Sequence, residues 1–514
     1  MSPAVPDAQA AVPDPRRWWT LAVLCFSLLV IALDNTILNV ALPTLQRDLD
    51  ASASELQWIV DSYMLVFAAV LLTAGALGDR FGRKKALTFG LLVFALGSGL
   101  SALADSSGML IATRALMGVG GAFIMPSTLS ILTAVFPAHE RGKAIGIWAA
   151  VSGLGIVIGP VTGGWLVEHG DWSLVFLVNL PFVAAALLSG RWLVPESLDP
   201  AKPRLDGTGF ALSSLGLGAL VWAIIEAPAR GWADGLILVA FAVAAAALGA
   251  FIAWELRVRE PMLDVRLFRN RRFSAASGAI AVAFFALFGT IFFLTQYLQS
   301  VLGYGAFESG LRVMPVAAGV VLGGPLSAKL VEHVGTKRVV CAGLALVAVG
   351  LTMLSGAEVG GGYGIVAAVL LVLGLGMGLT MAPATESVMG SLPLAKASVG
   401  SAVNDATRTM GGALGVAVLG SLLSSGYRAG MEGATQGLPA GAAETANQSL
   451  AGALAVAQRL GGGAGGRVSE AAQQAFVDGM HTAVLAGAAV AAAGALLTLV
   501  ALPARAPLAE PAPA

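Results

Sequence analysis

The chain has 514 residues, of which 57% are hydrophobic and 12% are charged, and its formal net charge is zero. Soluble proteins carry about 25% charged residues, and a mean hydropathy of +0.82 is typical of a protein that crosses a membrane many times. The zero net charge gives no overall attraction to nucleic acid, so no nucleic-acid partner is expected. Cys25 and Cys341 both lie in apolar runs, which indicates buried small hydrophobic side chains.

Long apolar stretches dominate the chain. A membrane span requires about 20 mainly apolar residues, and it must be helical because irregular backbone cannot face lipid. The first run carries Asp34 and lacks a cleavage site, so it indicates a retained span and no signal peptide. The sequence predicts an all-α polytopic membrane protein with fourteen spans, at 18–42, 56–77, 86–104, 109–134, 143–167, 172–193, 207–226, 235–255, 273–297, 309–331, 338–356, 363–386, 398–424 and 479–503.

Lysines and arginines orient these spans, because loops on the cytoplasmic side carry most of them. With the N-terminus inside, the inside segments hold 22 of the 30 basic residues. Both termini are therefore predicted to be cytoplasmic. The Gly/Ala-rich loop 425–478 is then outside, with room for a short helix around Ala440 to Leu460.

Two loops show a weak internal repeat. Residues 75–87 and 323–343 both place a glycine followed by basic residues just past an even-numbered span, as expected of transporters built from repeats. Two six-helix bundles would leave spans 7 and 8 as an inserted pair. The predicted organisation is a disordered cytoplasmic tail 1–17, a first bundle 18–193, an inserted helix pair with a basic linker 194–272, a second bundle 273–503, and a cytoplasmic tail 504–514.

Five motifs in order resemble those of the major facilitator superfamily, and more narrowly its fourteen-helix drug:proton antiporters of the EmrB/QacA type. One departure is Ser173, where this family usually has an arginine. The resemblance runs from about Trp18 to Leu502 and implies two six-helix bundles with an extra helix pair between them. The matching segments are LDNTILNVALP (33–43), WIVDSY (58–63), GALGDRFGRK (75–84), LIATRALMGVGGA (110–122) and GLGIVIGPVTGG (153–164).

Asp34 lies in the middle of an apolar run. An ionised, unpaired carboxylate there costs about 2.5 to 3.5 kcal/mol on insertion scales, and burial favours its protonated form. Such a group can bind a proton or a cationic substrate but not both, which forces exchange. Arg114 cannot lose its charge, so we expect Asp34 to be its partner; the alternative is a purely structural ion pair. The neighbouring hydrogen-bonding residues are Asn35, Thr36 and Asn39.

Other polar residues in spans leave alternatives open. Asp61, after Trp58, is either an entrance carboxylate for proton or substrate or an interfacial aspartate in water. Asp405 and Arg408 share a helical face at spacing i, i+3, so they either pair structurally or face the cavity, where Asn404 adds polarity. Glu386 is interpreted as a simple loop charge.

Two further motifs predict moving parts. Basic residues in the loop after span 2 are expected to pair with acids or with a helix C-terminus, so that the loop acts as a gate; its residues are Gly75, Asp79, Arg80, Gly82, Arg83 and Lys84. Small residues in span 5 predict a hinge that lets a helix of the other bundle approach closely; they are Gly155, Gly159, Pro160, Gly163 and Gly164.

The energy source is expected to be an ion gradient. No G-x-x-x-x-G-K-[ST] motif occurs, and the four histidines lack metal-ligand spacing. No nucleophile constellation lies in a span. We therefore expect no enzyme, no metal and no cofactor, with the proton gradient driving transport.

An apolar and aromatic cavity with a lone carboxylate suits lipophilic cations. The candidate lining residues are Phe26, Trp58, Tyr63, Phe292, Gln296 and Tyr297. The leading hypothesis is a monomeric multidrug or antibiotic exporter in the bacterial cytoplasmic membrane, which exchanges small lipophilic drugs for H+. The alternatives are an exporter of one endogenous metabolite or self-made antibiotic, and a membrane-embedded sensor.

Overall fold

The computed structural model describes residues 15–49, 51, 53–198, 206–393 and 396–503. Within these residues every regular element is helical. The bulk of both predicted tails, at 1–14 and 504–514, lies outside the described residues. In chain order the elements are α1 (Arg17–Asp48), α2 (Ala53–Phe81), α3 (Arg83–Ser101), α4 (Ser107–Val135), α5 (Ala138–His169), α6 (Leu174–Leu177), α7 (Asn179–Leu193), α8 (Gly207–Arg230), α9 (Gly235–Glu255), η1 (Val265–Arg269), α10 (Arg271–Gln296), η2 (Tyr297–Val301), α11 (Ala306–Arg312), α12 (Met314–Val334), α13 (Thr336–Leu354), α14 (Tyr363–Met389), α15 (Ala397–Met431), α16 (Ala440–Gln448), α17 (Leu450–Leu460) and α18 (Gly462–Ala501).

Twelve helical segments of the described chain are long and apolar enough to cross a membrane. The fold is therefore of the all-helical membrane type. Helices α3 and α5, which coincide with two further predicted spans, are not in this set of twelve. Predicted span 172–193 is built from two helices, α6 and α7, and α12 is preceded by the short α11.

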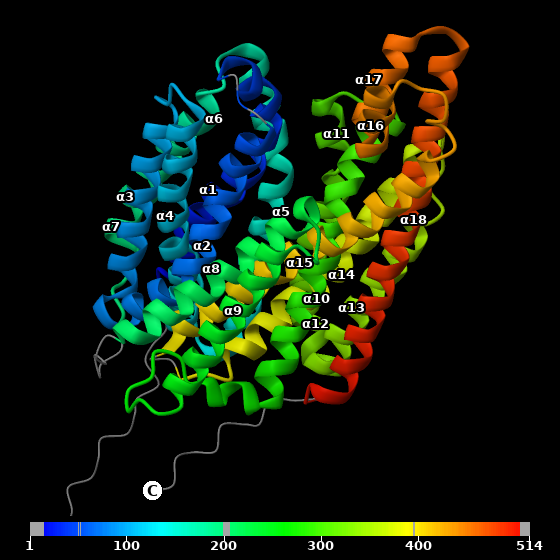
Figure 1. The fold of residues 1–514 in the computed structure, drawn as a ribbon. Coiled ribbons are helices and arrows are strands. Elements are labelled where there is room, and N and C mark those ends of the chain that lie inside the picture. Colours follow the sequence, from blue (N-terminus) through cyan, green and yellow to red (C-terminus); the bar gives the residue numbers. More distant parts are fainter. Residues whose placement is uncertain (1–14, 50, 52, 199–205, 394–395, 504–514) are drawn as a thin grey trace, which may run out of the picture.

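The helices form two halves with a helix pair between them (Figure 1). In the first half α1 packs on α5 and α7, while α4 packs on α2 and α3. In the second half α14 packs on α12 and α13, α10 packs on α15, and α18 packs on α13 and α15. We call the end where α1 begins and α18 finishes the inner end, and the opposite end the outer end.

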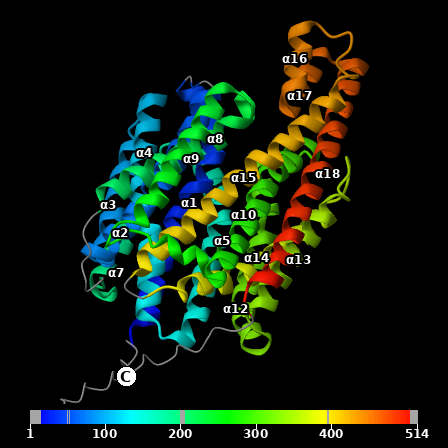
Figure 2. The same cartoon turned by 60° about the horizontal axis from the view of Figure 1, so that its bottom comes forward.

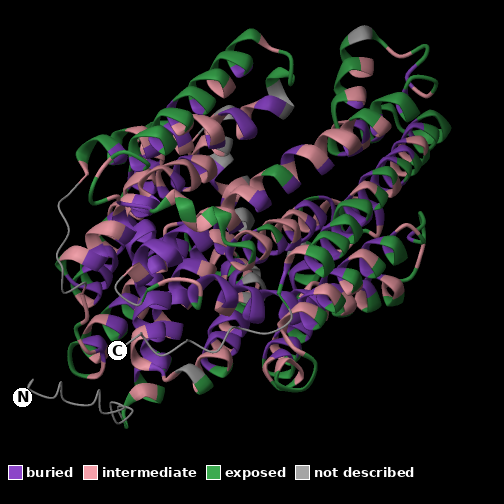
Figure 3. Cartoon of the chain, turned by 90° about the horizontal axis from the view of Figure 1, so that it is seen from below, coloured by how far each residue is buried: buried purple, intermediate pink, exposed green. Residues whose placement is uncertain are grey.

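The two halves meet through α5 and α15. Helix α5 contacts α12 and α14, and α15 contacts α2 and α4. Figure 2 shows α15 running obliquely from the inner end of the first half towards α16 and α17. Seen from below, buried residues gather in the middle of the molecule and exposed ones on the peripheral helices (Figure 3). The core of the protein therefore includes the junction of the halves at the inner end.

The inserted pair α8 and α9 bridges the halves. Helix α8 packs on α2 of the first half and on α15 of the second, and α9 packs on α8. Both helices start at a capping aspartate, because Asp206 accepts a hydrogen bond from the backbone of Gly209, and Asp234 from those of Leu236 and Ile237. Such caps satisfy amide groups that have no partner within the helix.

The segment 425–478, predicted to be a loop with one short helix, is mostly helical. Helix α15 continues to Met431, α18 already begins at Gly462, and α16 and α17 lie between them. Glycines allow the two long helices to touch, since a Cβ on Gly426 would meet Gly479 at 2.8 Å. The abundant alanines favour helix, so this outer extension is a packed hairpin of helices.

Candidate functional site

Asp34 lies wholly buried in the middle of α1. Its position is fixed by the packing of α1 on α5, where glycines leave room for α1. A Cβ on Gly155 would clash with Ala32, and one on Gly159 would clash with Thr36. The close approach of α1 and α5 therefore depends on glycines in α5. This packing fixes the position of Asp34 inside the first half.

The carboxylate of Asp34 is paired with Arg114 of α4. The Nη1 atom of Arg114 donates to Oδ2 of Asp34 at 2.5 Å, and both side chains are 1% exposed. The other oxygen, Oδ1, accepts a hydrogen bond from Nδ2 of Asn179 at 3.2 Å. The pairing predicted from the sequence is thus present in the structure, with both carboxylate oxygens occupied.

Arg114 makes further contacts that do not involve Asp34. Its Nε donates to the carbonyl oxygen of Ile59 at 3.2 Å, and its guanidinium lies over the ring of Tyr63 with 4.6 Å to the centroid. An arginine over an aromatic face is stabilised electrostatically. The arginine is therefore anchored to α2 whether or not Asp34 is charged.

Asn179 contacts the candidate site but was not identified from the sequence. It begins α7, is 1% exposed, and its Nδ2 lies 3.1 Å from the Oγ of Ser98 as well as near Asp34. Ser98 in turn donates to the carbonyl oxygen of Phe176. The signal in the sequence was an asparagine flanked by apolar residues, which is the pattern that had drawn attention to Asp34.

The other polar residues near Asp34 have different surroundings. The hydroxyl of Thr36 donates to backbone oxygens, including that of Gly155 on α5 at 3.0 Å, so it joins α1 to α5. Asn35 on α1 and Asp61 on α2 are partly buried. The side chains of Asn39 and Pro160 lie outside the described residues.

A second buried carboxylate and arginine lie on α15. Arg408 Nη1 donates to Oδ1 of Asp405 at 3.3 Å, and Asn404 Nδ2 approaches the same oxygen at 3.5 Å. Within the described chain, Oδ2 of Asp405 is buried without a hydrogen-bond partner. The pair is intrahelical, as the i, i+3 spacing predicts.

Arg408 also touches the other half of the molecule. Its guanidinium lies 5.0 Å from the ring centroid of Trp148 on α5 and 4.8 Å from that of Phe284 on α10. Trp148 is fully buried. The second ion pair is therefore placed where α5, α10 and α15 converge, at the junction of the two halves.

The predicted gating loop closes the inner end through a carboxylate. Asp79, at the inner end of α2, accepts hydrogen bonds from the backbone N–H groups of Ser398 (3.0 Å) and Val399 (3.1 Å) at the start of α15. Arg83 holds the same carboxylate through Nε and Nη2. The sequence predicted that basic residues of this loop pair with acids or with a helix C-terminus, and Arg83 does pair with an acid. The contact across the halves was not predicted: it is an acid at a helix N-terminus, where the dipole favours negative charge.

The remaining loop residues secure the turn within the first half. Gly82 has φ of +117°, a conformation that side chains disfavour, and a Cβ there would also meet the Glu196 carboxylate. The Lys84 amine donates to the carbonyl oxygen of Arg191 at the end of α7, so this cation does lie at a helix C-terminus. Arg80 lies over the ring of Phe81. Gly75 faces the backbone of Ser398 and the Cβ of Ala402.

Glu386 is not a loop residue, as the sequence suggested, but lies in helix α14. It is partly buried near the end of α14, between Arg141 of α5 and Arg272 of α10, with which it interacts electrostatically. A Cβ on Gly142 would lie 2.9 Å from its Oε2. Glu386 therefore lies against both halves at the inner end, as Asp79 does.

The small residues of α5 pack against a helix other than the one predicted. Gly155, Gly159 and Gly163 face Ala32, Thr36 and Ile37 of α1 in the same half, and Gly164 follows on the same helix. Close approach across the halves instead involves Gly146, where an added Cβ would lie 3.2 Å from the oxygen of Gly324 on α12. The close approach of α5 to the other half, predicted for residues 155–164, therefore occurs at an earlier turn of α5, at Gly146.

The predicted aromatic cavity residues are dispersed. Tyr297 is fully buried and its hydroxyl donates to the carbonyl oxygen of Glu358, so it is a structural residue. Phe26 packs against Phe182, and Trp58 is partly buried on α2. Phe292 is 44% exposed and Gln296 donates to its backbone oxygen. These side chains therefore have different surroundings.

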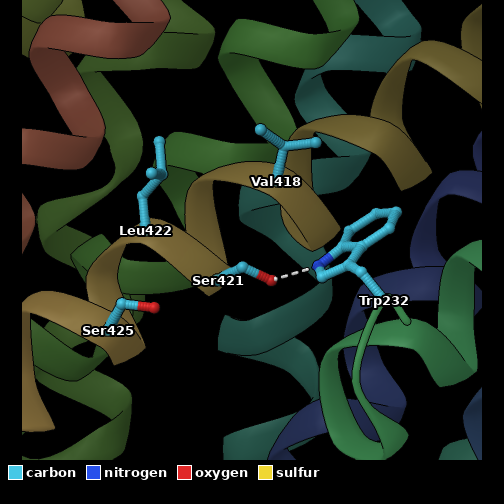
Figure 4. Close-up of a pocket in the computed structure, with 5 residues that line it drawn as sticks. All are labelled: Trp232, Val418, Ser421, Leu422 and Ser425. Atoms are coloured by element: carbon cyan, nitrogen blue, oxygen red, sulfur yellow. Dashed lines mark hydrogen bonds between the residues drawn. The ribbon is translucent and has the colours of Figure 1, made fainter. Parts of the chain in front are cut away.

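A pocket lies elsewhere, between the α8–α9 turn and α15 (Figure 4). The indole N–H of Trp232 donates to the hydroxyl of Ser421 at 3.0 Å. The wall on α15 alternates apolar and hydroxyl side chains, namely Val418, Ser421, Leu422 and Ser425. None of the predicted cavity residues lines this pocket. Among the described residues, no group of three or more His, Cys, Asp or Glu side chains is arranged to hold a metal ion.

Several known proteins are similar in sequence to this chain over most of its length. The tetracenomycin C resistance and export protein of Streptomyces glaucescens is 36% identical over 512 residues, covering 97% of this chain and 95% of the relative. The multidrug efflux pump LfrA of Mycolicibacterium smegmatis is 36% identical over 500 residues, covering 97% and 99%. The puromycin resistance protein pur8 of Streptomyces alboniger is 35% identical over 426 residues, covering 82% and 84%.

A solved structure shows the same fold at low sequence identity. The human organic anion transporter MFSD10 (TETRAN) matches with a TM-score of 0.64 at 14% identity, covering 95% of this chain and 100% of that one. The family model of the Major Facilitator Superfamily matches residues 24–416, which is more than half of the chain. The protein is thus an integral membrane protein with a transporter fold, and it belongs to the major facilitator superfamily.

Proposed function

We propose that this protein is a proton-coupled exporter of small lipophilic, cationic drugs or antibiotics, working by alternating access. The relatives named above are resistance, export and efflux proteins, and most of them align with nearly the whole chain. The observation that carries the coupling is the buried contact between Asp34 and Arg114. A carboxylate that is buried with a fixed cation has two stable states, ionised and paired or protonated and unpaired.

The exchange follows from this pair. A proton that reaches Asp34 neutralises it and weakens the attraction to Arg114, which keeps its contacts with Ile59 and Tyr63. The uncompensated arginine then disfavours a cation in the same half, while release of the proton restores the ion pair and removes this net positive charge. Proton and cationic cargo therefore occupy the site alternately. Asp405 is the second candidate acid, since Arg408 already contacts Trp148 of the first half.

The arrangement of the halves supports an outward-facing resting state. Asp79 joins α2 to α15 and Glu386 lies between α5 and α10, both at the inner end. These contacts must break before the inner end opens. Because these contacts lie at the inner end, the two halves can rock about the junction near Trp148. Helices α5 and α15 would move in this rocking.

We assign the fourteen-helix, EmrB/QacA-type architecture to the chain, with α3 and α5 as the two spans beyond the twelve. Helix α3 packs along α4, with Gly90 facing Gly120 and Gly97 facing Met117. Helix α5 packs along α1. Since α1 and α4 are apolar enough to cross the membrane, helices lying along them cross it too. The α8–α9 pair is then the insertion between two six-helix bundles.

The proposed location is the bacterial cytoplasmic membrane with both termini in the cytoplasm, because the inner end carries most of the basic residues. The protein acts as a monomer without a cofactor. One elementary charge moved through 100 mV supplies about 2.3 kcal/mol, which sustains roughly a fifty-fold gradient of cargo at about 1.4 kcal/mol per tenfold.

A narrower substrate range is the second candidate. The relative from Streptomyces glaucescens is named for resistance to and export of a single antibiotic, tetracenomycin C, and another relative is named for puromycin. An exporter of one self-made antibiotic or endogenous metabolite would use the same coupling pair. The two candidates differ in the number of unrelated lipophilic cations that compete for transport.

Transport in proteoliposomes tests the proposed function. An acidic lumen should drive uptake of a lipophilic cation by the wild-type protein, and Asp34→Asn should abolish it because the exchange of a proton for cargo is lost. Asp105→Asn is the matched control, since Asp105 is exposed in the turn before α4 and should transport normally. Normal proton-driven uptake by Asp34→Asn would reject the coupling role of Asp34.

A further inference from the structure

The linker between the helix pair and the second half is rich in arginine. Residues 256–272 contain six arginines and no lysine, against two acids, Glu260 and Asp264. Arginine binds phosphate groups with two parallel hydrogen bonds, whereas lysine acts as a point charge. Lysine and arginine orient membrane helices equally well, so orientation alone does not require arginine at every basic position of the linker. The six residues are Arg257, Arg259, Arg266, Arg269, Arg271 and Arg272.

Most of these arginines are exposed and unpaired. Arg272 is partly buried and interacts electrostatically with Glu386. The other five arginines are exposed, and within the described part of the chain no ion pair reaches any of them. Other cations at the inner end have partners, because Arg17 pairs with Glu140 and Arg83 with Asp79. The linker therefore carries five exposed arginines that form no ion pair with a described side chain.

The linker backbone is held in place. Asp264 accepts from the N–H of Arg266 and starts η1, and the Ser274 hydroxyl donates to the oxygen of Phe268 at the other end of η1. The N–H of Leu263 donates to the buried carboxylate of Glu255. Lys396, at the start of α15, donates to the oxygen of Pro261. A fixed backbone reduces the conformational entropy lost when the arginines bind a partner.

The linker lies at a membrane surface, since it joins the end of α9 to the start of α10 and both helices are long and apolar enough to span. Two large apolar side chains are exposed beside the arginines, Leu256 at 46% and Phe268 at 47%. An exposed apolar side chain next to cations is typical of a segment that lies in the interface, with its apolar groups in the acyl region and its charges among the headgroups.

We infer that residues 256–272 bind the phosphate headgroups of anionic phospholipids at the inner membrane surface. The arginines pair with phosphodiesters, and Leu256 and Phe268 enter the acyl layer. These apolar neighbours favour a lipid over a soluble phosphate compound. Because Lys396 ties the linker to the start of α15, a bound lipid also rests against the contact between α15 and Asp79. This inference does not depend on the substrate or on proton coupling.

The test uses the full-length protein in detergent, titrated with phosphatidylglycerol or phosphatidylcholine and followed by native mass spectrometry. The wild-type protein should bind phosphatidylglycerol in preference. Arg259→Gln/Arg266→Gln/Arg269→Gln should reduce this affinity on the order of 100-fold, since each arginine contributes roughly five-fold near an anionic surface. Lysine at the same three positions keeps the charge that orients the helices and should give an intermediate loss, because bidentate pairing is gone.

The matched control is Arg428→Gln/Arg459→Gln/Arg467→Gln, which removes three exposed arginines from the outer extension and should keep the preference for phosphatidylglycerol. Thermal midpoints in phosphatidylcholine alone should be equal for all variants, which separates lipid binding from misfolding. Equal binding of phosphatidylglycerol by the linker and control variants would overturn the inference. Competition by millimolar inorganic phosphate as strong as that by the lipid would overturn it as well.

Discussion

Asp79 on α2 and Ser398 on α15 lie 319 positions apart in the chain, yet the carboxylate of the first accepts a hydrogen bond from the backbone of the second. The acid also binds the next amide, that of Val399. Amide groups in the first turn of a helix have no partner within that helix. The first half of the molecule therefore completes the start of a helix that belongs to the second half.

Replacing Asp79 by Asn should loosen this junction. The variant loses the charge that pairs with Arg83 and binds two backbone amides, and hydrogen bonds to a charged group contribute about 1.5–3 kcal/mol each. Hydrogen exchange followed by mass spectrometry should show the amides of the first turn of α15 exchanging at least ten-fold faster. Asp105→Asn should leave that exchange unchanged, and unaltered protection in Asp79→Asn would contradict the sealing role.

Removing one member of the pair between Arg114 and Asp34 should cost more than removing both. Arg114→Gln leaves a buried carboxylate without its cation, a loss of about 3–5 kcal/mol when it stays ionised. Asp34→Asn/Arg114→Gln has no buried charge at this site, so its thermal midpoint should lie above that of Arg114→Gln alone. A double variant that is less stable than either single variant would argue against direct pairing.

Asn179→Ala should destabilise the first half of the protein. The variant removes the donor to Oδ1 of Asp34, and a hydrogen bond to a charged group contributes about 1.5–3 kcal/mol. A thermal melt should therefore show a lower midpoint for Asn179→Ala than for the wild-type protein. Ser189→Ala, on the exposed part of the same helix, is the control and should keep the wild-type midpoint.

Gly159→Ala should destabilise the first half. The added Cβ would overlap the hydroxyl of Thr36, so α1 and α5 must separate, and overpacking of this kind costs about 1–3 kcal/mol. The matched change is Gly249→Ala on α9, where nothing lies within 4 Å of the added atom. A thermal melt should show a lower midpoint for the first variant and no decrease for the second.

The sequence predicted what depends on composition and on charge. All-helical architecture follows from the length and apolarity of the runs, and the family from motifs that the comparison with known relatives confirms. The contact of Asp34 with Arg114 was predictable because an arginine in an apolar helix needs a carboxylate and few are present. The same reasoning did not reach Asn179, since a neutral side chain has many acceptable partners.

Interactions between distant helices were less predictable. Tyr297 occurs in an aromatic run that suits a cavity, but its hydroxyl reaches the backbone of Glu358 and the ring is buried. Glycines at spacing four predict close helix contact without specifying the partner, and Gly155 packs on α1 of its own half. Glu386 looked like a loop charge because its arginine neighbours lie 245 and 114 positions away.

In the proposed rocking motion helix α15 would move as a rigid rod, because it is one continuous element of 35 residues, about 50 Å long at 1.5 Å per residue. The inner end of α15 is hydrogen-bonded to Asp79, and its middle places Arg408 against Trp148. Its outer end extends into the packed hairpin with α18. A rotation of α15 by about 10° around its midpoint displaces each end of the helix by roughly 4 Å. The proposed motion therefore couples the breaking of the contact with Asp79 to a displacement of the outer hairpin.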